Sequence, residues 1–213
     1  MKHVIWDWNG TLLHDLPVIL DAVNTATTRL GMRTVTLEDY RTHYTRPVKV
    51  FYEKIAERPL DEAEWERIDR YFHERYHATV VHAELAAGAH QALTSIDGSE
   101  HSQSLLSMAP HEELKRWISF FGVGHYFAHV QGSIGSPGAP KASHLAIHLD
   151  AITTTPGDVV MIGDTVDDAL AAAEHGVDCV LYYDGSHHLG DLEAVGVPIT
   201  NSLVEAVAIA LDL

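Results

Sequence analysis

The sequence predicts an α/β protein: a Rossmann-like, doubly wound parallel sheet that carries an inserted all-helical domain. From residue 84 onward, short apolar segments alternate with segments of helical periodicity. This alternation is typical of parallel strands joined by helical crossovers. Between the first apolar segment and residue 84, by contrast, almost every segment is helical in pattern. We therefore expect a core domain of residues 1–14 and 84–213 and a helical domain of residues 15–83.

The first strand is expected at residues 3–6, because this segment is short, apolar and rich in β-forming residues. A helix should follow over 16–30, where apolar residues recur at helical spacing, and Gly31 favours an end there. Asp61 is a suitable N-cap, since Glu64 three residues later completes a capping-box pattern. The other helices expected in this domain are 36–43, 47–58 and 61–78.

The remaining elements alternate along the core. The expected helices are 84–96, 110–121, 140–149, 166–175 and 201–211. The expected strands are 102–106, 127–131, 158–162 and 178–182. Strand–helix–strand units of this kind give right-handed crossovers, so all these strands should run parallel.

Composition narrows the class of protein. The 213 residues are 46% apolar, which allows a substantial core, and the formal net charge of −16 argues against a nucleic-acid partner. No apolar run approaches the ~20 residues that span a bilayer. The single cysteine, Cys179, fits a reducing compartment, and no signal peptide is evident. We expect a cytoplasmic protein without a membrane partner, either a monomer or a homodimer.

Acidic residues follow two of the expected strands. Asp7 comes directly after strand 3–6, and Asp164 follows strand 158–162, with Asp168 one helical turn later. Ligands of α/β proteins bind at this edge of the sheet. Clustered carboxylates are costly unless a cation neutralises them, and hard oxygen ligands suit Mg²⁺. The alternative is that Asp164 and Asp168 only cap the following helix.

Two further positions suggest that the protein binds an anion. Ser107 and Met108 follow strand 102–106, where a hydroxyl and backbone N–H groups before a helix can hold a phosphate. An ordinary helix cap is the alternative. Lys141 begins a helix, a position that disfavours a cation. This placement indicates that Lys141 interacts with an anion rather than with the helix.

Taken in order, these motifs resemble the haloacid dehalogenase superfamily, in particular its phosphoglycolate phosphatase-like members with a helical cap of the C1 type. Asp7-Trp8-Asn9-Gly10-Thr11 matches the first motif, and Ser107 the second. Lys141 matches the third, and Gly163-Asp164 with Asp168 the fourth. The resemblance covers essentially the whole chain.

The resemblance implies a Mg²⁺-dependent phosphohydrolase that acts on a small phosphorylated metabolite through an aspartyl-phosphate on Asp7. The metal would be held by Asp7, the backbone carbonyl of Asn9 and Asp164, with Asp168 beside it. The phosphoryl oxygens would be held by Ser107, Met108, Lys141 and Trp8. Arg46, in the helical domain, is the residue expected to contact a substrate anion.

Asn9 departs from the family pattern. In the family's phosphatases an aspartate at this position protonates the leaving group, whereas an amide cannot transfer a proton at neutral pH. Loss of a general acid–base typically removes ~10²–10⁴ in rate. Three interpretations follow: a phosphatase for substrates with good leaving groups, a slow phosphatase, or a catalytically weak protein that binds a phosphorylated ligand in a regulatory role. The substitution argues against a phosphomutase, and the acidic fourth motif against a dehalogenase.

Two other chemistries stay open. Phosphonate cleavage would use Lys49 or Lys54, the only lysines of the helical domain, as a Schiff-base residue. Zinc hydrolysis is suggested by the H-E-x-x-H pattern that begins at His73 and ends at His77, with His82 or Glu84 as the third ligand. A plain amphipathic helix is the simpler explanation of that pattern.

Overall fold

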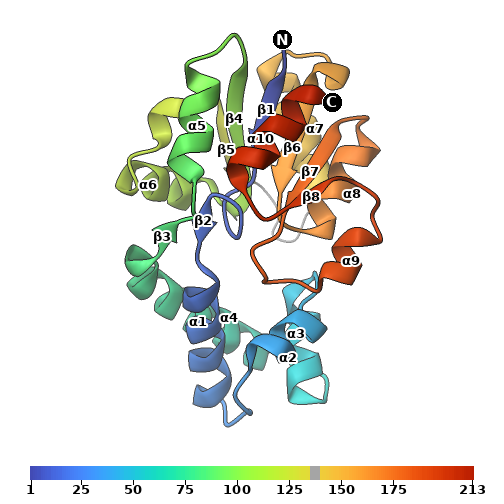
Figure 1. The fold of residues 1–213 in the computed structure, drawn as a ribbon. Helices are drawn as coiled ribbons and strands as arrows, with labels where there is room; N and C mark the ends of the chain where they lie inside the picture. Colours follow the sequence, from blue (N-terminus) through green and yellow to red (C-terminus); the bar gives the residue numbers. More distant parts are fainter. Residues whose placement is uncertain (135–139) are drawn as a thin grey trace. The chain divides into compact units, whose positions relative to one another are not determined.

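The computed structural model describes residues 1–134 and 140–213. Within them, six parallel strands form one sheet in the order β5-β4-β1-β6-β7-β8 (Figure 1). The strands are β1 (His3–Trp6), β4 (Ser102–Pro110), β5 (Val130–Ser133), β6 (Val159–Gly163), β7 (Asp178–Tyr182) and β8 (Ile199–Thr200). The expected parallel α/β sheet is confirmed, with β1 between β4 and β6.

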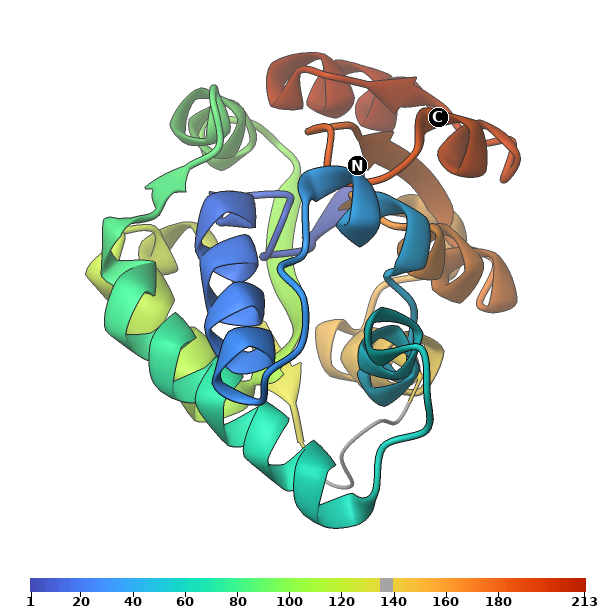
Figure 2. The ribbon, with the colours of Figure 1, turned by 90° about the horizontal axis from the view of Figure 1, so that it is seen from below.

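Helices cover both faces of this sheet. Helices α5 (Ala89–Asp97) and α10 (Leu203–Asp212) contact each other on one face, and α7 (Lys141–Ile152) and α8 (Val166–Glu174) contact each other on the opposite face (Figures 1 and 2). Helix α6 (His111–Phe120) packs beside β4 and β5, and α9 (Leu189–Glu193) is a short helix before β8.

The face of β1 that meets α7 carries both apolar and polar residues. Ile5 packs in one buried cluster with Leu145 of α7 and Met161 of β6. Because side chains alternate along a strand, His3 and Asp7 lie on the same face as Ile5. The apolar middle of this face is thus flanked by a polar residue at each end.

The chain divides into two compact units. One comprises Met1–Leu13, Leu85–Gly185 and Leu189–Leu213, and the other His14–Glu84 with Ser186–His188. The helices of the second unit are α1 (Leu16–Arg29), α2 (Leu37–His43), α3 (Val48–Ala56) and α4 (Glu62–Thr79). The capping box at α4 forms as expected, because Asp61 accepts from the backbone N–H of Glu64 and Glu64 accepts from that of Asp61.

The second unit has an aromatic and aliphatic core of its own. Phe51 and Tyr52 of α3 are buried with Ile68 of α4, and Tyr40 of α2 packs edge-on to Phe51. These residues line the inner faces of the helices, which explains why the helical periodicity of the sequence is strong here.

Several element boundaries differ from the expectation. Helix α5 begins at Ala89 rather than at residue 84, because Gly88 adopts φ +81° and the preceding Glu84–Leu85 forms strand β3, which pairs with β2 (Leu13–His14). The strand expected at 127–131 runs over 130–133, and β4 continues to Pro110 through an irregularity after Leu106.

Helix α9, strand β8 and the membership of Ser186–His188 in the second unit were not expected. These pieces are too short for a clear periodicity, so their structure depends on pairing and packing. Among the described residues, no helix combines the length and apolar character that a membrane span requires.

Candidate active site

Three carboxylates meet where β1 and β6 end. Asp7 directly follows β1, and its backbone N–H donates to the carbonyl of Ile162 in β6 at 2.9 Å. Asp164 follows β6, and Asp168 lies in the first turn of α8. The three side chains are buried, and one oxygen from each lies within 4.8 Å of the others. The sequence expectation that these acids gather at one edge of the sheet therefore agrees with their observed positions.

Lys141 is the cation of this cluster. It is the first residue of α7 and is 4% exposed, and its Nζ donates to Asp7 Oδ1 at 2.6 Å and pairs with Asp168 Oδ1. Burial alone would lower the pKa of Lys141, but the charges of Asp168 and Asp7 outweigh burial and raise it. The side chain therefore stays protonated. It interacts with carboxylates rather than with its own helix, which agrees with the interpretation of its position in the sequence.

Asp168 both caps its helix and takes part in the cluster. Its Oδ2 accepts from the backbone N–H of Thr165 at 3.0 Å and from the Thr165 hydroxyl at 2.6 Å. Its Oδ1 pairs with Lys141. Burial opposes ionisation, but Lys141 and the Thr165 hydrogen bonds lower the pKa of Asp168 overall. The capping alternative is thus correct for Asp168 without excluding a place in the site.

The cluster has an excess of negative charge. Burial raises the pKa of Asp7 well above its usual range; Lys141 counteracts this, while the charges of Asp168 and Asp164 add to it. One lysine cannot balance three carboxylates in a buried site. A divalent cation would supply the missing charge and lower the pKa of Asp7. The donors are hard carboxylate oxygens, so they fit such an ion.

Two glycines let the backbone approach these carboxylates closely. Gly10 has φ +77°, and a Cβ at this position would collide with the carboxylate of Asp164. A Cβ at Gly163 would collide in the same way with Asp168. Thr11 adds a hydrogen bond from its hydroxyl to Asp164 Oδ1 at 3.2 Å. The turn after β1 therefore positions Asp164 as well as Asp7.

The expected phosphate-binding residues lie around the same sheet edge. Ser107 is buried in β4, the neighbour of β1, and its Oγ accepts from the backbone N–H of Ala109 at 3.1 Å, which leaves the hydroxyl proton for another acceptor. Ser107 thus lies within a strand that continues to Pro110 rather than just after its end. Met108 is the half-buried residue next to it.

Trp8 and Asn9 differ in which of their groups could contact a ligand. The indole of Trp8 is fully buried against Phe121, with ring centroids 5.9 Å apart, so only its backbone could face a ligand. Asn9 is half-buried in a tight turn in which the Gly10 N–H donates to the carbonyl of Leu13 at 3.0 Å. The turn holds the Asn9 backbone next to Asp7.

The candidate residues of the helical unit belong to a separate part of the chain. Arg46 is exposed and precedes α3. Lys49 pairs with Glu62 at 3.2 Å, as expected of a solvated helix residue rather than a Schiff-base lysine. Among the described residues, Asp7, Asp164 and Asp168 are the one group of three metal-type ligands, so His73 and His77 do not gain His82 or Glu84 as a third ligand.

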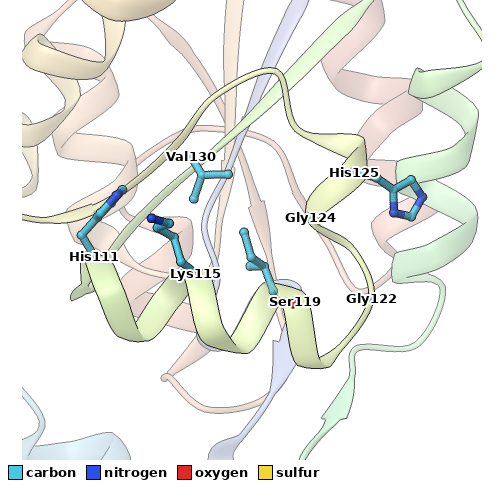
Figure 3. Close-up of a pocket in the computed structure, with 8 residues that line it drawn as sticks. His111, Lys115, Ser119, Gly122, Gly124, His125 and Val130 are labelled. Carbon is cyan, nitrogen blue, oxygen red and sulfur yellow. The ribbon is translucent and has the colours of Figure 1, made fainter.

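A pocket of about 500 Å³ lies elsewhere in the α/β unit (Figure 3). It is lined by His111, Lys115, Ile118, Ser119, Gly122, Gly124, His125 and Val130. None of the clustered carboxylates lines it, and Lys115 pairs with Glu112 at 3.6 Å. This pocket is therefore separate from the carboxylate cluster.

Two residues that organise the cluster were missed by the sequence reasoning. Thr11 orients Asp164, and Thr165 orients Asp168. For Thr165 a signal existed, because Thr165 and Asp168 have the spacing of a capping box. The contact of Thr11 spans 153 positions in sequence, so no local pattern could have revealed it.

Comparisons with known proteins place this geometry in a family. Residues 4–182 match the model of the haloacid dehalogenase-like hydrolases. The chain is 24% identical to a phosphoglycolate phosphatase of Psychrobacter arcticus over 82% of this chain and 80% of that protein. It is also 24% identical to a phosphoglycolate phosphatase of Cereibacter sphaeroides over 88% of both chains.

Solved structures show the same fold at low sequence identity. A haloacid dehalogenase-like family hydrolase from Streptococcus pneumoniae superposes with a TM-score of 0.85, at 21% identity and 98% coverage of both chains. A protein described as a predicted phosphatase from Clostridium acetobutylicum gives a TM-score of 0.86, at 19% identity and over 100% of this chain and 99% of that one. Since the family model spans most of the chain, this protein belongs to the haloacid dehalogenase-like hydrolase family.

Proposed function

We propose that the protein is a Mg²⁺-dependent phosphohydrolase that acts on a small phosphorylated metabolite, as its relatives named phosphoglycolate phosphatases do on theirs. The observation that carries this proposal is the pairing of Asp7 with Lys141 at 2.6 Å inside a buried cluster of three carboxylates. A carboxylate beside a fixed cation and a metal-type ligand set is suited to attack a phosphoryl group.

In this proposal Asp7, the backbone carbonyl of Asn9 and Asp164 hold Mg²⁺, and Asp168 lies beside it. When bound, the ion offsets negative charge on the phosphoryl oxygens and on Asp7. Asp168 contributes mainly by holding Lys141, because both of its oxygens are already engaged by Thr165 and Lys141.

The proposed reaction has two steps. An oxygen of Asp7 attacks phosphorus, the bond to the leaving-group oxygen breaks, and that oxygen leaves with the electron pair. Water then attacks phosphorus, which releases phosphate and restores the Asp7 carboxylate. Lys141, the Ser107 hydroxyl and the backbone of Met108 and Trp8 hold the phosphoryl oxygens throughout, so that the site stabilises charge where it develops.

Asn9 sets the kind of substrate that this site can turn over well. Its amide neither gives nor takes a proton at neutral pH. A leaving group that is stable as an anion needs no proton, so acyl phosphates and phosphoanhydrides should react faster than alkyl phosphates. The same substitution supports the second candidate, a catalytically weak protein that binds a phosphorylated ligand in a regulatory role.

A phosphatase assay with Mg²⁺ tests these proposals. It compares acetyl phosphate, p-nitrophenyl phosphate and an alkyl phosphate on the wild type, on Asp7→Asn and on Asn9→Asp. We expect Asp7→Asn to abolish turnover, and Asn9→Asp to increase alkyl phosphate turnover by roughly 10²-fold or more. Full activity in Asp7→Asn would contradict the assignment of Asp7 as the nucleophile. Phosphate binding without turnover of any substrate would favour the second candidate, a protein that binds a phosphorylated ligand without hydrolysing it.

Arg46 is proposed to contact an anionic group of the substrate from the helical unit. A contact made equally in the bound and transition states changes KM but not kcat. Arg46→Ala should therefore raise KM and leave kcat nearly unchanged, whereas Arg58→Ala, at another exposed arginine of the helical unit, should change neither. An unchanged KM in Arg46→Ala would remove Arg46 from the site.

A further inference from the structure

The pocket beside α6 is not used by the proposed phosphatase reaction, yet its lining combines hydrogen-bond donors with apolar side chains. Its volume of about 500 Å³ lies within the ~300–1,000 Å³ that is typical of small-molecule pockets. We propose that it binds a small organic oxyanion, in which a phosphate, phosphonate or carboxylate group is attached to a compact apolar body. The donors bind the charged group, and the apolar side chains contact the body.

The polar side chains of this pocket come mainly from one side of α6. His111, Lys115 and Ser119 follow one another at four-residue spacing, which places neighbouring members on the same face of the helix. Figure 3 shows His111 and Lys115 rising from α6 on the side of Val130, with His125 apart from them. Among the described residues, no aspartate or glutamate lines the pocket. The polar side of the pocket therefore offers donors without a competing carboxylate.

The His111 ring is held in an orientation that makes it a donor. The backbone N–H of Gly132 in β5 donates to its Nδ1 at 3.1 Å. Because Nδ1 accepts this hydrogen bond, Nε2 carries the ring proton and can donate to a ligand. Gly132 can approach this closely because it has no side chain, since a Cβ there would collide with the backbone of His111 and Ala109. The contact between β5 and the start of α6 therefore orients the ring before a ligand binds.

Lys115 supplies positive charge one turn after His111. Its Nζ lies 3.6 Å from Glu112 Oε1, and the two side chains are 54% and 73% exposed. An exposed ion pair of this kind contributes little to stability, so an anion can replace Glu112 as the partner of Lys115 at small cost. The exposed hydroxyl of Ser119, one turn further along, is a third donor. A cation and two neutral donors suit a group with two or three negatively charged oxygens.

The apolar part of the lining comes from Ile118 and Val130. Ile118 of α6 is buried and Val130 of β5 is half-buried, so both belong to the packed part of the α/β unit. Gly122 and Gly124 also line the pocket and, without side chains, leave room for a ligand. Burying the apolar body of a ligand against Ile118 and Val130 adds a hydrophobic contribution that a bare inorganic anion lacks. The lining therefore favours an organic anion over inorganic phosphate.

A titration of the full chain, followed through its glycine amides by NMR, tests the site. Phenylphosphonate is the first probe, because it carries a charged group and an apolar ring but no phosphate ester that the proposed reaction could hydrolyse. The amides of Gly122 and Gly124 report binding at the pocket. Those of Gly10 and Gly163, which lie against the clustered carboxylates, report binding at the candidate active site. Benzoate, inorganic phosphate and benzyl alcohol are titrated in the same way.

We expect the amide signals of Gly122 and Gly124 to shift and to saturate with phenylphosphonate or benzoate, and the tighter of the two identifies the charged group. Inorganic phosphate lacks the apolar body and benzyl alcohol lacks the charge, so each should bind at the pocket roughly fivefold more weakly or worse. Shifts confined to Gly10 and Gly163, or equal affinity of the pocket for inorganic phosphate, would overturn the proposal.

Two matched variants locate the charged contact. Lys115→Gln and Arg116→Gln each remove one positive charge from an exposed position of α6, but of these two residues only Lys115 lines the pocket. Lys115→Gln should weaken binding of phenylphosphonate roughly fivefold or more, because the anion loses a charge-assisted hydrogen bond. Arg116→Gln should weaken it by roughly twofold at most, through the screened general field. An equal loss of affinity in both variants would contradict a specific site at Lys115.

Discussion

Helix α7 makes a buried polar contact at each end of the face that it packs against the sheet. At its start, Lys141 lies between Asp7 and Asp168, and all three side chains are buried. This end is charged, and its charge is tied to the proposed chemistry.

Two turns later, the same face of α7 carries a neutral network. His148 Nε2 lies 2.7 Å from the Ser104 hydroxyl, which lies 2.7 Å from His3 Nε2. Burial, together with His129, lowers the pKa of His3 to about 4 and of His148 to about 3. Between the two ends, Leu145 and Ile5 are part of one apolar cluster.

The difference between the two ends shows under which conditions a buried side chain keeps its charge. A lysine between two fixed carboxylates is more stable in its ionised form than in its neutral form, because partners of opposite charge offset its loss of hydration. Histidines that meet only hydroxyls and another histidine have no such partner, so they remain neutral. The same helix face thus carries part of the proposed active site at one end and a neutral buried network at the other.

The largest expected effect comes from removing the cation. Lys141→Met leaves buried carboxylates unpaired, so the free energy of unfolding of the metal-free protein should fall by about 3–5 kcal/mol, and turnover should fall by roughly 10²–10³-fold. The matched change at the other end, His148→Leu, should cost about 1–3 kcal/mol and leave turnover unchanged. Chemical denaturation measures the free energy of unfolding of both variants, and steady-state kinetics measures their turnover. A loss of turnover in His148→Leu would contradict the view that the histidine end has no part in the reaction.

Binding of Mg²⁺ should stabilise the native protein through the carboxylate cluster at the Lys141 end of α7, and not through the histidine end. At a concentration 100 times Kd, a ligand that binds only the native state adds about 2.7 kcal/mol. We expect this increment in the wild type and in His148→Leu, and its loss in Asp164→Asn. Thermal unfolding with and without Mg²⁺ is the measurement. An increment that survives in Asp164→Asn would place the ion elsewhere.

The two ends should respond to pH with opposite sign. The native pKa values of His3 and His148 lie below the usual 6.5, so the unfolded chain binds more protons and stability falls as pH decreases from about 6.5 toward 4. The pKa of Asp7 is raised, so in the metal-free protein its contribution to stability falls as pH increases above its usual value of 3.8.

Denaturation at several pH values in saturating Mg²⁺ isolates the histidine end. Each neutral buried histidine contributes a slope of at most about 1.4 kcal/mol per pH unit. The slope between pH 6.5 and 4 should therefore be smaller in His148→Leu than in the wild type. The same slope in both proteins would mean that His148 does not titrate in this range on unfolding.

The smallest effects should come from single hydrogen bonds. Ser104→Ala at the neutral end and Thr11→Val at the charged end each remove one hydroxyl, at a cost of about 0.5–1.5 kcal/mol. Only Thr11→Val should also weaken Mg²⁺ binding, because the Thr11 hydroxyl orients Asp164. Magnesium titration of both variants is the test, and equal Mg²⁺ affinity would remove Thr11 from the site.

The sequence by itself determined the elements whose signals are local. The apolar segments over β1, β6 and β7 and the capping box at Asp61 depend on neighbours within a few residues, so they could be predicted. The same reasoning placed acids at strand ends, because parallel strands bring their carboxyl ends to one edge of the sheet.

Only the tertiary structure decided which side chains meet. Lys141 and Asp7 are 134 positions apart, and nothing local in the sequence fixes their contact. Strand β8 and the placement of Ser186–His188 depend on partners distant in the chain. The sequence marked Lys141 by its position at the start of a helix, but nothing in it showed that His148 would be buried and neutral. Burial and the partners available to each decide which keeps its charge.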